Sequence, residues 1–311
     1  MMRWWAAVAI GAMLALPAAA ETLRVEGVFA AQAREASLLP TIGVGPFTGP
    51  DGAELADAIE RRLAKLGADG LPHVRLIPPA LRPDGLLTGR TGVQVASSDY
   101  REGRERCAEK KDGKCTRRER YNVACVRRTV ALRADLEVRR RTGALPYAIA
   151  KTRDDRSDWC EDRGLATNVE GVVSGMIESV AAEVQHDLAP HAEDYTVRVI
   201  ETRDGLPADA AARFKQAVKL TKHDPAAACA VFAEVDRMAP DHGATAFNLA
   251  LCAESAGRYR EAADRYARAR LFAPYAGGEV SKGLARVTAL AAGAQDVALM
   301  RSRPPVTGSG F

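Results

Sequence analysis

Three cysteines lie within nineteen residues, in the stretch CAEKKDGKCTRRERYNVAC: Cys107, Cys115 and Cys125. Lysine and arginine crowd the same stretch. Cysteines at such spacing can bind zinc, act as a redox pair or form disulfides, and basic side chains can contact nucleic acid. Which chemistry applies depends first on the compartment, because disulfides persist only in an oxidising one.

Residues 1–20 predict a secretory signal peptide. A charged start precedes an apolar stretch from Trp4 to Leu16, and the small residues Ala18 and Ala20 precede the expected cleavage point. The apolar stretch is shorter than the roughly 20 residues of a membrane-spanning helix. There is no cysteine near the cleavage point for a lipid anchor, and no later segment is apolar enough to cross a membrane. We therefore expect a periplasmic protein with no transmembrane segment in the mature chain.

All the cysteines lie beyond the expected signal peptide. Their even number, in an oxidising compartment, favours disulfides over metal ligation. Without Arg3, 43 of the 44 lysines and arginines remain against 40 acidic residues, and this near balance does not indicate a polyanionic partner. The candidate disulfide residues are Cys107, Cys115, Cys125, Cys160, Cys229 and Cys252.

Residues 21–203 mix strand and helix patterns and predict an α/β domain with a mixed sheet and packed helices. Capping boxes, at Asp51 with Glu54 and at Thr167 with Glu170, mark two helix starts. Alternating apolar residues predict a hairpin. The expected elements are a strand at 41–47, a helix at 51–66, a strand at 73–78, a hairpin over 121–154 turning near Gly143, a helix at 167–188 and a strand at 195–200.

This order of elements resembles the domain shared by curli-secretion proteins and the amino-terminal domain of TolB. The resemblance implies an envelope-associated interaction domain that oligomerises, and not an enzyme. A curli secretion channel also has membrane-spanning strands and a lipid anchor, and the sequence shows neither. The matching residues are Ile42, Val44, Pro46 and Phe47 in the strand and Gly52, Ala56 and Ile59 in the helix.

A 34-residue repeat separates Pro240 from Pro274, and the residues before each proline align. This period resembles the tetratricopeptide repeat family. The resemblance implies a short all-α array over residues 207–297, with a first helix at 207–221, a capping helix at 279–293 and a concave surface for a protein or peptide partner. The tail 298–311 reads as disordered. The packing residues it implies are Ala228, Phe232, Pro240, Leu249, Ala250, Ala262, Tyr266, Ala269 and Pro274.

In such an array Cys229 and Cys252 fall on neighbouring helices. A disulfide between them fits the resemblance, and two buried thiols that pack as small apolar side chains are the alternative.

The other candidate sites lack the spacing that their chemistry needs. Gly43 and Gly45 follow a strand, but neither a dinucleotide-binding nor a phosphate-loop pattern continues from them. His186 and His191 have no third zinc ligand in the sequence pattern. We find no serine-nucleophile motif. The sequence therefore predicts no catalytic, cofactor or metal site.

Residues 101–141 carry 15 lysines and arginines against 7 acidic residues. An anionic envelope component is one candidate partner, and the solvated face of a hairpin is the alternative that the alternation favours. Nucleic acid is not expected, because the protein is exported and lacks interleaved aromatic residues.

Cys107, Cys115, Cys125 and Cys160 permit three pairings. The Lys-Asp-Gly turn signal lets Cys107 and Cys115 flank a loop, and Cys125 would then pair with Cys160 across the hairpin. We expect a non-catalytic periplasmic interaction or scaffold protein. The alternative is an accessory of an envelope secretion or assembly complex that oligomerises through its N-terminal domain.

Overall fold

The structure is a computed structural model that describes residues 21–67, 70, 72–163 and 168–303. An N-terminal part built on a mixed sheet is followed by a helical C-terminal part, so the expected fold class is confirmed. The expected signal peptide, with Ala18 and Ala20, lies outside the described residues.

The main sheet has four strands in the order β2-β3-β4-β5. β2 pairs parallel with β3, and the other two pairings are antiparallel. β4 and β5 form the predicted hairpin, whose connection contains Gly143 at a positive φ of 88°. The strands are β2 (Ile42–Thr48), β3 (Gly85–Lys111), β4 (Lys114–Arg140) and β5 (Tyr147–Cys160).

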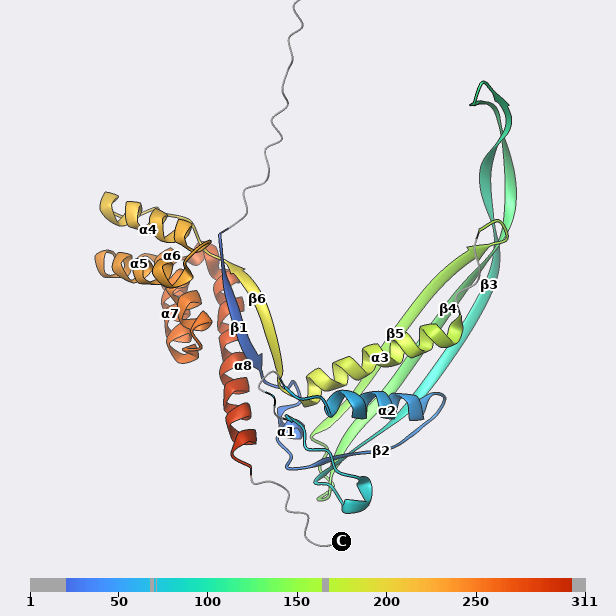
Figure 1. The fold of residues 1–311 in the computed structure, drawn as a ribbon, viewed down its shortest axis with the longest axis horizontal. Helices are drawn as coiled ribbons and strands as arrows, with labels where there is room; N and C mark the ends of the chain where they lie inside the picture. The colour runs from blue at the N-terminus through green and yellow to red at the C-terminus, as the bar shows by residue number, and fades with distance from the viewer. Residues whose placement is uncertain (1–20, 68–69, 71, 164–167, 304–311) are drawn as a thin grey trace, which may run out of the picture. The chain divides into compact units, whose positions relative to one another are not determined.

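Alternation along β4 determines which face of the sheet is covered. Its even-numbered residues from Val130 to Val138 are buried, and Arg133 and Arg139 on the other face are exposed. The buried face packs against α2 (Gly52–Leu63) and α3 (Val169–Leu188), which lie along the sheet in Figure 1. Two short helices, α1 (Arg34–Ser37) and η1 (Pro79–Leu81), flank β2 in the sequence.

The C-terminal helices form two antiparallel pairs and a long last helix. α4 pairs with α5, and α6 pairs with α7. Asp224 accepts a hydrogen bond from the N–H of Ala227 and caps α5. We call α4 to α7 the helical array. The elements are α4 (Ala208–Leu220), α5 (Pro225–Met238), α6 (Gly243–Ser255), α7 (Tyr259–Phe272), η2 (Pro274–Ala276) and α8 (Gly277–Arg301).

The last helix is longer than the sequence analysis expects. α8 continues past residue 293 to Arg301, so residues 298–301 of the expected disordered tail are helical. Residues 304–311 lie outside the described part.

The boundary between the two parts differs from the expected one. The chain divides into a unit of residues 1–26 and 194–288 and a unit of residues 27–193 and 289–311. β1 (Thr22–Phe29), which the sequence analysis did not predict, pairs with β6 (His191–Arg198). The helical unit therefore includes the start of β1 and most of β6.

Three local expectations are wrong. Residues 73–78 form no strand and make only the single bridge Ile42–Leu76, because Pro78 and η1 follow at once. Asp51 adopts a left-handed conformation without a side-chain cap, so α2 lacks the expected capping box. At α3 the cap is Asn168, which accepts a hydrogen bond from the N–H of Glu170, and Thr167 lies outside the described residues.

Candidate interaction surfaces

The six cysteines form the three preferred pairs: Cys107–Cys115, Cys125–Cys160 and Cys229–Cys252. The disulfides fit an oxidising compartment. Cys229 on α5 and Cys252 on α6 link the two helix pairs of the helical array. The other two disulfides lie in the long hairpin of β3 and β4 and at the end of β5.

The hairpin of β3 and β4 continues beyond the end of β5 as a two-stranded ribbon. β5 ends where Cys160 pairs with Cys125, so within the described residues the strand partners of residues 101–124 come from this stretch itself. We call residues 101–124 the arm. Its turn consists of Asp112 and Gly113, both at positive φ (53° and 77°), which is the type I′ geometry of a two-residue hairpin. The sequence predicts a hairpin only from residue 121 and a loop between Cys107 and Cys115, because the many charged residues of the arm hide its strand pattern.

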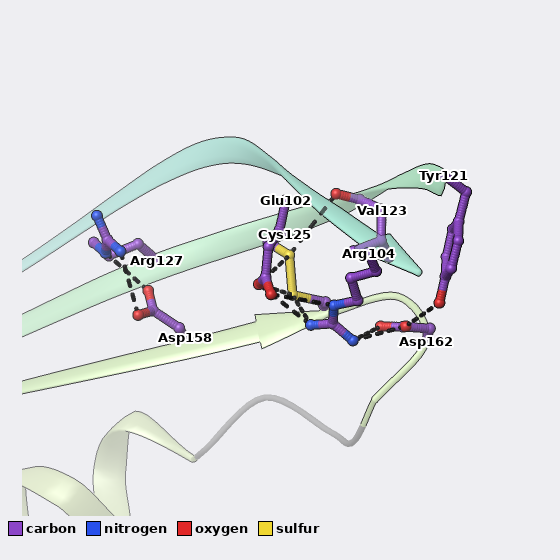
Figure 2. Close-up of a disulfide and its surroundings, with 9 residues drawn as sticks. Glu102, Arg104, Tyr121, Val123, Cys125, Arg127, Asp158 and Asp162 are labelled. Atoms are coloured by element: carbon purple, nitrogen blue, oxygen red, sulfur yellow. Dashed lines mark hydrogen bonds and ion pairs between the residues drawn. A yellow bond between two sulfur atoms is a disulfide. The ribbon is translucent and has the colours of Figure 1, made fainter. Parts of the chain in front are cut away.

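The base of the arm is fixed by a disulfide and a salt bridge. Arg104 Nη1 lies 2.7 Å from both carboxylate oxygens of Asp162, just after β5, and the Tyr121 hydroxyl donates to Asp162 at 3.2 Å. Figure 2 shows Arg104 between Glu102 and Asp162, next to the disulfide of Cys125. These contacts attach the ribbon to the end of β5.

Glu102, Cys125 and Cys160 form the only group of three potential metal ligands close enough for one ion within the described residues. Both sulfurs are joined in the disulfide, and Glu102 also pairs with Arg104. A disulfide sulfur is not a thiolate ligand. The oxidised protein therefore has no donor set for zinc at this point.

Most arginines of the arm are neutralised by nearby carboxylates. Glu105, Glu109 and Glu119 accept from arginines on the opposite strand, and the guanidinium of Arg106 also lies over the Tyr121 ring, 5.2 Å from its centroid. These pairs explain much of the basic composition as internal pairing. The paired arginines are Arg104, Arg106, Arg117, Arg118 and Arg120.

The second candidate surface is the inner face of the helical array. Every residue of α6 from Gly243 to Glu254 is buried, whereas an ordinary amphipathic helix buries one face. Val199 and Leu23 belong to the same core as α6, and Val197 and Ile200 pack against it. An extended segment of the chain itself therefore contributes to the burial of α6.

Asn248 binds the backbone of this extended segment with both ends of its amide. Its Oδ1 accepts from the N–H of Ile200 and its Nδ2 donates to the Ile200 carbonyl, both at 2.9 Å. Asn248 is fully buried. The sequence analysis missed this residue, although one asparagine within an apolar helix is a signal for a buried polar contact.

A buried carboxylate joins three further elements to α6. Glu254 has no exposed surface and accepts from the hydroxyls of Tyr195 and Tyr266, each at 2.7 Å, and from Arg286 of α8, also at 2.7 Å. Burial, followed by the charge of Glu254, raises the pKa of Tyr266, so the phenol stays a donor. The sequence analysis missed this network, because its members lie far apart along the chain.

An open part of the inner face remains beside the extended segment. A depression of about 640 Å³ is lined by residues 198–202, Phe247, Tyr275, Ala276 and Glu279. The side chain of Tyr275 is 63% exposed there. An exposed aromatic residue beside apolar residues is typical of a protein contact.

Seven of the packing residues implied by the repeat period are buried, and two are exposed. Ala228, Phe232, Ala250, Ala262, Tyr266 and Ala269 have no exposed surface, and Leu249 is buried. Pro240 and Pro274 are exposed, each just after the second helix of a pair.

The two histidines near the end of α3 stay close together. The rings of His186 and His191 lie 4.3 Å apart, and His191 Nε2 is 3.2 Å from Glu193. Burial, followed by the charge of His186, lowers the pKa of His191. They do not belong to a metal-ligand group in the described part of the chain.

No family model matches the chain, and no curated protein does. Among solved structures, the chain is similar to a dodecamer of a single-substitution variant of PelC from Paraburkholderia phytofirmans, with 17% identity and a TM-score of 0.22. The match covers 54% of this chain and 97% of that one. Among the described residues, no helix combines the length and apolar character needed to span a membrane.

Proposed function

We propose that the protein is a non-catalytic periplasmic interaction protein whose tetratricopeptide-type array binds an extended segment of a partner protein. The observation that carries the proposal is the depression of about 640 Å³ beside the extended residues 198–202, where the aromatic side chain of Tyr275 is exposed. Extended segments of many sequences can bind along such a surface, and pockets for individual side chains add specificity.

The partner segment would bind in the depression beside residues 198–202. Phe247 contributes to the apolar lining of this depression, and the aromatic ring of Tyr275 is exposed in it. A partner with an apolar anchor residue fits this lining, because aromatic side chains in partly buried pockets contribute most to binding energy.

A photo-crosslinking amino acid at position 275 tests the proposal. Position 238 is the control, because Met238 is also exposed but does not line this depression. We expect an envelope protein to be captured from position 275 and not from 238. Tyr275→Ala should then weaken binding of that protein at least tenfold, and Met238→Ala less than threefold. Equal capture at both positions would contradict the proposal, as would enzymatic turnover that a single polar substitution abolishes.

The sheet supports a second candidate, an accessory of an envelope assembly that oligomerises through its N-terminal domain. β5 is an edge strand, and β2 covers β3 only as far as Arg90. Unpaired strand edges can pair with another copy. Light scattering after size-exclusion chromatography separates the candidates: a discrete ring supports the assembly accessory, and a monomer supports the interaction protein.

We also propose that the arm contacts an anionic component of the envelope. It carries 9 lysines and arginines against 5 acidic residues over residues 101–124. Binding to an anionic resin that falls with salt, and that a deletion of the arm abolishes, would support this contact.

A further inference from the structure

The three lysines of the arm lie together at its tip. Lys111 pairs in register with Lys114 across the turn, and Lys110 precedes them. All three side chains are exposed. None of them forms a salt bridge in the described part of the chain, in contrast to the five paired arginines. With Asp112 in the turn, the tip carries three positive charges against one negative charge.

The tip is held rigid far from the main sheet. An isolated two-stranded ribbon is only marginally stable in water, and Cys107–Cys115 closes this one next to its turn. Ten residues separate Arg101 from Lys111, so the ribbon is about 33 Å long at about 3.3 Å per residue. Charges are screened within about 8 Å at physiological salt. The tip lysines therefore act on a surface independently of the charges on the sheet.

The residue types at the tip favour one class of anionic partner over the others. Protein interfaces are depleted in lysine and rely on aromatic and arginine anchors, and residues 108–114 contain no aromatic or large apolar side chain. Single-stranded nucleic acid needs aromatic stacking platforms, which the tip also lacks. Lysine is a hydrated point charge without a fixed bonding geometry, which suits a surface of many phosphate groups.

We propose that the tip formed by Lys110, Lys111 and Lys114 docks on an anionic phospholipid bilayer. This inference rests on the anionic contact of the arm proposed above, and it names the bilayer surface as the partner. It does not depend on peptide binding by the helical array.

Sedimentation with vesicles tests the inference. The protein should lack residues 1–20, so that the apolar leader cannot insert by itself. Vesicles contain either about 30% phosphatidylglycerol in phosphatidylcholine or phosphatidylcholine alone. The test variant is K110Q/K111Q/K114Q. The matched control is R106Q/R117Q/R120Q, which removes the same net charge from the same arm but from residues paired with glutamates.

We expect the protein to bind the anionic vesicles only, and the affinity to fall as salt rises. The lysine variant should lose about a hundredfold in affinity, since each of the three basic residues near such a surface contributes about fivefold. The arginine variant should lose less than threefold. Equal losses in the two variants would overturn the inference, because they would show a diffuse charge effect.

Polyphosphate, a soluble phosphate polymer, distinguishes the bilayer inference from the more general anionic contact of the arm. If the protein ignores the vesicles but binds polyphosphate through the tip lysines, the bilayer inference falls and the anionic contact stands. If it binds neither, both fall. Inorganic phosphate and chloride at equal ionic strength are then compared for their ability to release the bound protein from the vesicles. Equal release supports a contact with the bilayer surface, and greater release by phosphate contradicts it.

Discussion

Asn248 and Ile200 make the contact that defines the inner face of the helical array: one buried side-chain amide satisfies both backbone groups of one extended residue. The contact ties the segment that follows β6 to the middle of α6. The depression lined by residues 198–202 lies beside this contact.

Replacing this amide should destabilise the helical unit. Asn248→Ala removes two hydrogen bonds and leaves the Ile200 backbone groups unpaired in a buried site, so we expect a loss of about 2–3 kcal/mol in unfolding free energy. Urea unfolding monitored by circular dichroism measures it. Asn122→Ala on the exposed arm is the control and should change stability by less than about 0.5 kcal/mol. A similarly small change in the Asn248 variant would mean that the contact contributes no stability.

Replacing one member of the buried pair of Glu254 and Arg286 should lower the unfolding free energy more than Asn248→Ala does. Glu254→Gln leaves the Arg286 guanidinium without its counter-charge, and we expect a loss of about 3–5 kcal/mol. Glu261→Gln removes an exposed carboxylate paired with Arg258 and Arg265, and should cost less than about 1 kcal/mol. The double variant E254L/R286M should recover part of the loss, because it leaves no unpaired buried charge. A double variant less stable than E254Q would contradict this explanation.

His242 should make the helical unit less stable in mild acid. Its Nδ1 accepts a hydrogen bond from the N–H of Thr245 at the start of α6, which requires an unprotonated nitrogen. Burial lowers the pKa of His242 below the ordinary value of a histidine. The unfolded chain therefore takes up the proton first. The stability that unprotonated His242 contributes is fully present above its pKa in the unfolded chain, about 6.5. It is lost as the pH falls through the lower pKa of His242 in the folded protein.

The measurement is the unfolding free energy at about pH 7.5 and at about pH 5.5, on either side of the unfolded pKa. His242→Asn keeps a side-chain acceptor at the helix start and should flatten the difference between the two values. The exposed His223→Asn should leave it unchanged. An undiminished pH dependence in the His242 variant would assign the effect to other groups, such as His191, whose pKa is also lowered.

The disulfides should differ in what they stabilise. In C107S/C115S, hydrogen exchange of the arm amides should rise at least tenfold while the melting temperature stays within about 2 °C, because the arm buries little core. In C229S/C252S the helical unit should lose about 3 kcal/mol, as expected for a loop of this length. Exchange at the arm that stays slow without Cys107–Cys115 would show that the arginine–glutamate pairs hold the ribbon by themselves.

The local features of this protein follow from its sequence. The first helix of the array, expected at 207–221, lies at Ala208–Leu220. The turn signal between Cys107 and Cys115 indicated the preferred pairs of the first four cysteines, the repeat resemblance suggested Cys229–Cys252, and alternation along 121–154 indicated the hairpin of β4 and β5.

The features on which the proposals rest depend on how the chain folds back on itself. The outer half of β3 carries little apolar pattern, and its pairing with β4 is what makes it a strand. Asn248 with Ile200, and Glu254 with Arg286, are pairs whose members lie 48 and 32 residues apart. A single polar residue in an apolar helix signals a buried contact, but its partner is fixed only in the tertiary structure. Likewise, composition showed a basic region, and only the tertiary structure showed that five arginines of the arm pair with carboxylates, whereas the tip lysines form no salt bridge with any described residue.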